Sequence, residues 1–322
     1  MIVATELGLL YAVMALGVYL TFRILDFPDL TVDGSFTTGA ACAAMLITGG
    51  INPFLATAAG FGAGLLAGIV TGVLHTKGNI NGLLAGILTQ IGLYSINLRI
   101  MDGANAPLLR KVTAMSPLRD NGLSGTWVSV GVFAAFAILA TFIIVWFLRT
   151  DLGLAMQATG ENEVMARSFG IATDRQKILG LALSNGLVGL AGAIVAQYQG
   201  FADISMGVGL IIAGLASVII GQALFGNRTV VIAAFAVVLG SVLYRIAIQV
   251  AMDLGLDPND MKLMSAALVV LALVPPQTRL IARLKGLRTP PKPVGPHGTL
   301  TTQDYVDDID DIEVAANTGR RL

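Results

Sequence analysis

The fold is decided by residues 127–148, which read WVSVGVFAAFAILATFIIVWFL and contain no charged residue. An α-helix of about 20 apolar residues is long enough to cross a hydrocarbon core of about 30 Å. Runs of the same kind recur through the 322 residues, of which 55% are hydrophobic and 12% are charged. Ordinary soluble domains carry about 25% charged residues. The sequence therefore predicts an all-α polytopic membrane protein and excludes an ordinary soluble domain.

The apolar runs predict about nine membrane spans, within a range of about eight to ten. The second run is too short to cross a membrane as a helix, and residues 26–35 before it mix acids, a proline and hydroxyls. Irregular polar backbone at membrane depth needs cover from protein or from a water-filled cavity. We therefore expect a broken or re-entrant second helix. The spans are expected near 3–22, 36–49, 53–75, 80–98, 127–148, 178–199, 207–225, 230–252 and 262–278.

The placement of positive residues predicts the orientation of the chain. We expect a membrane domain over residues 1–280 and a cytoplasmic tail over 281–322, where the composition turns basic and then acidic. With the N-terminus outside, the cytoplasmic segments hold 14 Lys and Arg residues and the outer segments hold five. Cytoplasmic loops are enriched in Lys and Arg. The predicted orientation therefore has the N-terminus outside and the C-terminus inside.

A stripe of glycines predicts close helix packing. Gly60, Gly64, Gly68 and Gly72 recur every four residues within one expected span. Glycine removes the side chain that keeps two backbones apart, and small residues at this spacing are typical of membrane helix contacts. We expect this face to pack closely against another helix.

Several function classes lack their characteristic residues. The chain contains no Gly-x-x-x-x-Gly-Lys-Ser/Thr motif, so we do not expect it to hydrolyse ATP. His75 and His297 form no metal-ligand cluster, and the lone Cys42 permits no disulfide within the chain. The formal net charge of +0 does not indicate nucleic-acid binding. We predict no catalytic residue, no metal and no cofactor bound by this chain.

The long polar interruption at residues 149–177 predicts a short surface helix. Gly160, Glu161 and Asn162 indicate its start, because acids favour the N-terminal end of a helix dipole, and Gly170 indicates its end. Its apolar side must pack against either lipid headgroups or another protein. The apolar residues of this expected helix are Val164, Met165, Ala166 and Phe169.

The acids and hydroxyls before the second apolar run predict a solute path. Asp29, Thr31, Asp33 and Ser35 combine ionisable and hydroxyl groups with an expected helix break, as midplane transporter sites do. Asn81 and Gln90 in the expected fourth span extend the candidate path. The alternative is a structural role, in which a carboxylate such as that of Asp33 caps free N–H groups. Glu6 and Arg245 also lie in expected spans, and a structural and a functional role are both open for them.

Four segments in order carry a family resemblance: Asp29 to Ser35, Thr76 to Asn81, Gly160 to Ile171, and Leu187 to Gly192 with Val218 to Gly226. They resemble segments of the permease subunits of bacterial ABC importers of the branched-chain amino acid and ribose type. The sequence of the first segment is similar to the branch described as putative tryptophan/tyrosine importers. The match covers about residues 8–274.

This resemblance implies a membrane permease without enzymatic activity of its own. Two copies of such a subunit form the membrane core, and each lays a coupling helix, here within 160–170, into a cytoplasmic ABC ATPase dimer. ATP and Mg²⁺ are then bound by the ATPase, and an extracytoplasmic binding protein delivers the solute. The resemblance implies uptake of a small polar solute such as an amino acid, by alternating access, across the bacterial inner membrane.

Two other function classes fit parts of the sequence. An ion- or proton-coupled secondary transporter would use Glu6, Asp29, Asp33 or Arg245, but it leaves the surface helix without a role. An intramembrane enzyme would need paired catalytic groups, which the sequence does not contain. Copurification with an ATPase separates the importer from both alternatives.

Overall fold

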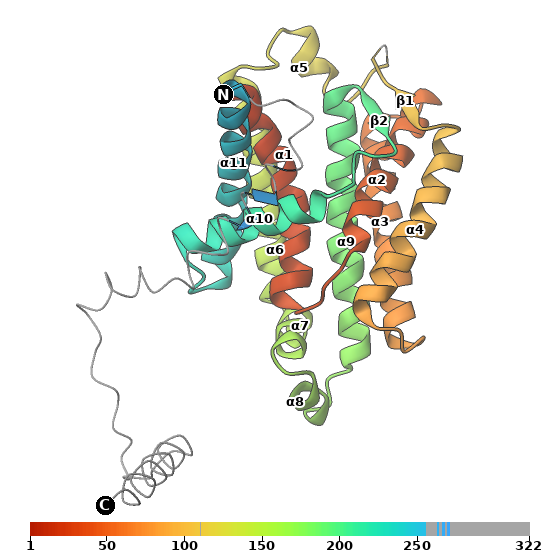
Figure 1. Cartoon of the computed structure of the whole chain (residues 1–322), viewed down its shortest axis with the longest axis vertical. Coiled ribbons are helices and arrows are strands. Elements are labelled where there is room, and N and C mark those ends of the chain that lie inside the picture. Colours follow the sequence, from red (N-terminus) through yellow and green to blue (C-terminus); the bar gives the residue numbers. More distant parts are fainter. Residues whose placement is uncertain (110, 256–262, 264–265, 268, 271–322) are drawn as a thin grey trace, which may run out of the picture. The chain divides into compact units, whose positions relative to one another are not determined.

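The computed structural model describes residues 1–109, 111–255, 263, 266, 267, 269 and 270. Long helices form a bundle, and short elements lie at its two ends (Figure 1). The elements are α1 (Ile2–Tyr19), the π-helix η1 (Leu20–Ile24), α2 (Thr31–Thr48), α3 (Pro53–Thr76), α4 (Gly82–Met101), β1 (Asn105–Pro107), α5 (Ser116–Asp120), α6 (Trp127–Leu148), α7 (Asp151–Glu161), α8 (Glu163–Ser168), α9 (Thr173–Gln199), β2 (Phe201–Asp203), α10 (Leu210–Phe225) and α11 (Val230–Asp253).

The described part of the chain contains six helices that are long and apolar enough to cross a membrane. They are α1 with η1, α3, α4, α6, α9 and α11, while α10 is a shorter apolar helix. The predicted number of nine spans is therefore not confirmed. The expected ninth span at 262–278 lies largely outside the described residues, and the tail at 281–322 lies wholly outside them. The mostly helical class is confirmed, with one addition: β1 and β2 pair as a short antiparallel ribbon.

The second helix differs from the prediction. It starts at Thr31 rather than near residue 36 and continues without a break to Thr48. The early start follows from Asp29, whose Oδ1 accepts a hydrogen bond from the Thr31 N–H at 2.9 Å. The non-helical backbone lies before α2, where Asp26 has a φ of 51°. Within this connection Phe27 and Asp29 are buried, whereas Asp26 and Pro28 are exposed.

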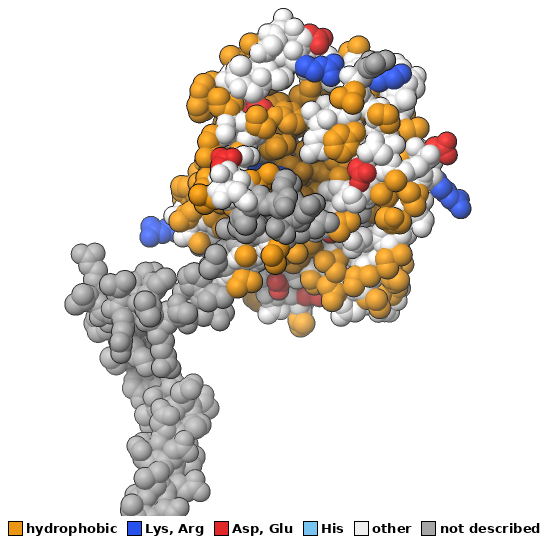
Figure 2. Space-filling model, turned by 45° about the horizontal axis from the view of Figure 1, so that its top comes forward, with side chains coloured by type: hydrophobic (Ala, Val, Ile, Leu, Met, Phe, Trp, Pro, Cys, Tyr) orange, Lys and Arg blue, Asp and Glu red, His pale blue; other side chains and the backbone are white. Residues whose placement is uncertain are grey.

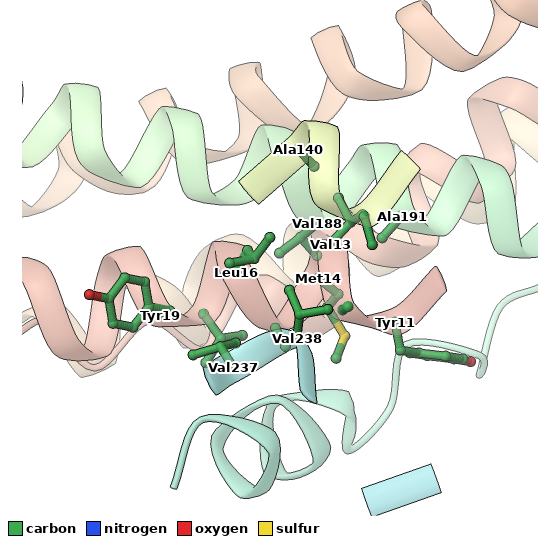
Figure 3. Close-up of a cluster of buried hydrophobic side chains, with 14 of the residues drawn as sticks. Tyr11, Val13, Met14, Leu16, Tyr19, Ala140, Val188, Ala191, Val237 and Val238 are labelled. Carbon is green, nitrogen blue, oxygen red and sulfur yellow. The ribbon is translucent and has the colours of Figure 1, made fainter. Parts of the chain in front are cut away.

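Helix α1 forms the centre of the largest apolar core. In Figure 3, Val13, Met14 and Leu16 of α1 lie among side chains from three other helices. Those side chains are Ala140 of α6, Val188 and Ala191 of α9, and Val237 and Val238 of α11. The most apolar stretch of α1 is 78% buried, whereas that of α4 is 28% buried. Helix α1 is thus an interior helix, and α4 presents most of its surface outward.

The predicted glycine stripe forms the contact between α3 and α9. A Cβ atom added at Gly64 would overlap the Asn185 carbonyl oxygen, and one at Gly68 would overlap that of Leu181. At Gly72 an added Cβ would lie 2.8 Å from the Ile178 Cα, and at Gly60 it would lie 2.8 Å from the Ala193 Cβ. The prediction of a close helix contact is confirmed, and the partner helix lies within the same chain.

The two ends of the bundle carry different elements. Helices α7 and α8 lie at one end, while α5, the β1–β2 ribbon and the N-terminus lie at the other (Figure 1). On the face seen in Figure 2, apolar side chains cover much of the surface and charged side chains are few. A surface of apolar side chains is stable against lipid, whereas charged side chains are costly there.

Candidate functional site: the surface helix and a buried polar path

The surface helix predicted between residues 160 and 170 is α8, which follows α7 after a kink at Asn162. The Asn162 side chain caps α8, because its Oδ1 accepts a hydrogen bond from the Met165 N–H at 2.9 Å. The predicted start at Gly160 is wrong: Gly160 and Glu161 are the last residues of α7. Gly160 is needed for packing, since an added Cβ would overlap the Ile24 carbonyl oxygen. The predicted end is confirmed, since α8 stops at Ser168 and Gly170 has a φ of 84°.

Ionic contacts fix α8 against the first turns of α9. Lys177 Nζ lies 2.7 Å from Glu163 Oε2. Arg167 Nη2 lies 3.2 Å from Glu163 Oε1 and 3.1 Å from Asp174 Oδ1. The hydrogen bond from Lys177, with the positive charges of Lys177 and Arg167, holds the pKa of the Glu163 carboxyl below its usual value. The carboxylate is therefore charged at neutral pH, and its contact with Lys177 joins α8 to α9.

The apolar residues of α8 divide between the interior and the surface. Val164 is 81% exposed, Met165 is 55% exposed and Phe169 is 73% exposed. Ala166 is 3% exposed and packs inside this chain. Val164, Met165 and Phe169 therefore form the outward apolar surface, and Ala166 supports the helix from behind.

A buried polar network joins three of the predicted path residues to α9. Asn185 Nδ2 donates to Asp29 Oδ2 at 2.6 Å, and Ser35 Oγ donates to Asn185 Oδ1 at 2.7 Å. The Thr31 and Thr71 hydroxyls lie 2.7 Å apart, and Thr71 donates to Thr89 at 2.9 Å. Asn185 lies near the middle of α9, so this network links α2, α3, α4 and α9 deep inside the bundle.

Asp33 occupies a different place from Asp29. Its carboxylate accepts hydrogen bonds from the Gly209 N–H at 2.8 Å and from the Ile211 N–H at 2.9 Å. It therefore holds the start of α10 against α2. Asp33 and Gln90 also line one cavity of about 360 Å³, which we call the α2–α4 cavity.

Asn81 lies apart from the other predicted path residues. Its Oδ1 accepts from the Leu83 N–H at 3.0 Å and caps α4. It lines a separate cavity of about 420 Å³ with His75, Glu163 and Lys177, next to α8. The structure thus groups Asp29, Thr31 and Ser35 in the network, Asp33 and Gln90 at the α2–α4 cavity, and Asn81 near α8.

Glu6 and Arg245 both have partners within the chain. Glu6 accepts hydrogen bonds from the Gly125 N–H at 3.0 Å, from the Tyr198 hydroxyl at 2.5 Å and from Ser129. The Arg245 guanidinium lies 3.8 Å from the centre of the Tyr11 ring, as in a cation–π contact. These contacts support a structural role for both residues.

Sequence reasoning did not assign Asn185, Thr71 or Thr89 to the path. Asn185 was visible as an isolated amide in an apolar run, whereas single threonines are common in membrane helices. Only the fold brings these side chains to Asp29 and Thr31. Among the described residues there is no group of three or more His, Cys, Asp or Glu side chains that could hold a metal ion.

Long apolar helices around a buried polar network define a multi-span membrane protein. Residues 3–274 match the family model described as "Branched-chain amino acid transport system / permease component". The chain belongs to this family, whose members are permease components of transport systems for amino acids or sugars and are not enzymes.

Curated relatives cover most of the chain. It is 42% identical over 263 residues to the tyrosine transport system permease protein of Clostridioides difficile (strain R20291), covering 82% of this chain and 86% of that one. It is 28% identical over 213 residues to the ribose import permease protein of Escherichia coli (strain K12), covering 65% of each chain. No solved structure matches the chain.

Proposed function

We propose that this chain is the permease subunit of an ATP-driven importer and that α8 is its contact with a separate ATPase subunit. In this arrangement the ATPase binds ATP and Mg²⁺, and this chain binds no cofactor. ATP binding and hydrolysis move α8, and the ionic contacts of Glu163 with Lys177 and of Arg167 with Asp174 transmit the movement to α9. The solute then passes by alternating access between two states of the bundle.

The outward apolar surface of α8 carries this proposal. Val164, Met165 and Phe169 are exposed on α8 and at its C-terminal cap, outside the long apolar helices. Charged side chains of α8 pair with Asp174 and Lys177 at the start of α9. An exposed apolar patch with a polar rim is typical of a protein–protein contact. Family membership supports an ATPase as the partner.

The end of the bundle that carries α8 then faces the cytoplasm. Because the N-terminus lies at the opposite end (Figure 1), this places it outside, in agreement with the distribution of Lys and Arg. We infer a location in the bacterial inner membrane, a binding protein at the outer end, and a second copy of the chain beside the first. The similarity to a tyrosine transport system permease supports an amino acid or a related small polar solute as cargo.

The proposal is tested by placing a carboxylate on the outward face of α8. Val164→Asp and Met165→Asp should leave membrane insertion intact and weaken ATPase association at least tenfold. A carboxylate buried at an apolar contact without a partner costs several kcal/mol. The measurement is copurification of the ATPase with the tagged permease, together with ATP-dependent uptake in vesicles.

Val112→Asp is the matched control, because Val112 is 73% exposed and lies outside α8, in the chain before α5. This control should retain the ATPase at the wild-type level. Wild-type association in both α8 variants would refute α8 as the contact.

A further inference from the structure

The α2–α4 cavity has the size and lining of a small-molecule site. Its volume of about 360 Å³ lies at the lower end of the range for ligand pockets. Ile91, Tyr94, Ile204 and Val208 give it apolar and aromatic walls. The polar lining residues are Asp33, Thr37, Gln90, Ser95 and Asn97, so the lining formed by the described residues contains no Lys, Arg or His.

Asn97 is the unusual member of this lining. It is 1% exposed, and neither its Nδ2 nor its Oδ1 has a hydrogen-bond partner among the described residues. The buried amide of Asn185, by contrast, has three partners: Asp29, Ser35 and the Leu181 carbonyl. In the part of the chain that the structure describes, Asn97 is the one buried side chain with both amide atoms unpaired.

An unpaired amide is costly in a membrane span, because neither apolar side chains nor lipid can supply its hydrogen bonds. A leucine of similar volume would fill the same space without that cost. Rotation about the χ2 torsion of Asn is broad, so the amide can turn toward the cavity without a change in the backbone. The position is therefore explained if a polar group enters the cavity and pairs with the amide.

We propose that Asn97 determines solute specificity by pairing with a hydroxyl or amide on the side chain of a transported amino acid. The apolar walls and the Tyr94 ring receive the body of that side chain. Because the described lining residues supply no cation to pair with the solute carboxylate, the charged backbone of the solute stays outside this cavity. This inference rests on the proposed function, since it assumes an amino acid as cargo.

The first experiment compares uptake of L-tyrosine and L-phenylalanine by the complete transporter in vesicles. The two probes differ only in a hydroxyl, and a site that hydrogen-bonds a hydroxyl discriminates against the analogue lacking it. Asn97→Leu should lower L-tyrosine uptake at least tenfold and reduce the preference for L-tyrosine over L-phenylalanine. Its melting temperature should equal or exceed that of wild type, because the substitution removes an unpaired amide.

Two control variants accompany this measurement. Thr141→Val removes a buried hydroxyl of α6 that bonds only its own helix, and it should leave uptake unchanged. Asn185→Leu makes the same substitution at a fully paired amide and should lower the melting temperature. An unchanged L-tyrosine preference in Asn97→Leu, or a loss of uptake in proportion to a loss of stability, would overturn the inference.

A second experiment does not depend on transport. In a Cys42→Ala background, Asn97→Cys should react with a small water-soluble methanethiosulfonate, and Ser217→Cys, buried in α10, should not. If the wild type takes up neither amino acid, the proposed cargo is wrong, and this reaction still decides whether the cavity admits polar molecules. Reaction at position 97 supports the site, and protection of Asn97→Cys from the reagent overturns it.

Discussion

At the scale of single residues, the buried acids of this protein serve as points of attachment between helices. Asp29 binds Asn185 of α9, Asp33 binds the start of α10, and Glu6 binds Tyr198 and the segment before α6. A buried carboxylate is stable when donors surround it, and it becomes costly when they are removed. The acids that suggested coupling to a proton or ion thus each have hydrogen-bond donors in the fold.

The attachment formed by Asp33 is testable by an isosteric substitution. Asp33→Asn should lower the free energy of unfolding by about 1–2 kcal/mol, as the loss of a helix cap does. One of the two N–H groups at the start of α10 then faces an amide donor instead of an acceptor. Melting temperature and uptake should fall together in the same preparation. Asp203→Asn makes the same change on the β1–β2 ribbon, where Asp203 is partly exposed, and should have a smaller effect. Loss of uptake at unchanged stability would instead assign Asp33 to solute contact.

At the scale of elements, the close approach of α3 and α9 organises the interior. Gly64 and Gly68 allow the backbone of α3 to contact carbonyl groups of α9. This close approach brings Thr71 of α3 and Asn185 of α9 into the polar network. Without a hydrophobic driving force between helices in lipid, such packing contacts supply much of the association.

Two glycines of α3 with opposite surroundings test this contact. Gly64→Val should abolish folding or strongly lower the melting temperature, because overpacking costs about 1–3 kcal/mol even where side chains can move and here the obstacle is backbone. Gly62→Val places the same side chain where nothing lies within 4 Å, and it should remain near wild type. Thermal unfolding of both variants in detergent is the measurement. Equal losses of melting temperature in the two variants would show that the low helix propensity of valine, and not the α3–α9 contact, causes the loss of stability.

At the scale of the whole molecule, one chain supplies one α8, whereas an ATPase dimer presents two equivalent surfaces. Helices α3 and α4 are only 33% and 28% buried in their most apolar stretches, so they leave faces for lipid or for a second copy. The glycine stripe of α3 is already used inside the chain, so it is not a candidate for the contact between copies.

We expect two copies of the chain in the assembled transporter. Native mass measurement of the detergent-solubilised complex should give two permease chains for each pair of ATPase chains. As an internal check, Val164→Asp should release the ATPase while the permease dimer persists. A mass corresponding to one permease chain per ATPase pair would refute the dimer.

Much of this architecture was predictable, because hydropathy and small-residue spacing are local properties of the sequence. Residues 127–148 had to form a membrane helix, Gly60 to Gly72 had to meet another backbone, and Gly170 had to end a helix. The outward position of Val164, Met165 and Phe169 also followed from the polar background around them. Other predictions did not hold: nine spans are not confirmed, α2 is unbroken, and Gly160 packs inside α7. Helix α2 begins at Thr31, whose N–H donates to the Asp29 carboxylate.

The sequence by itself determined that this chain spans a membrane, where its main helices lie and which of them pack closely. Only the tertiary structure decided what the polar residues do. Asp33 accepts a hydrogen bond from Gly209, 176 residues later, at the start of α10, and Asp29 pairs with an amide 156 residues away. Asn97 looks like any other amide in the sequence, and its lack of hydrogen-bond partners among the described residues arises only in the folded bundle. The physical reason is that hydrophobic burial depends on composition over a window, whereas hydrogen bonding depends on the positions of particular atoms after folding.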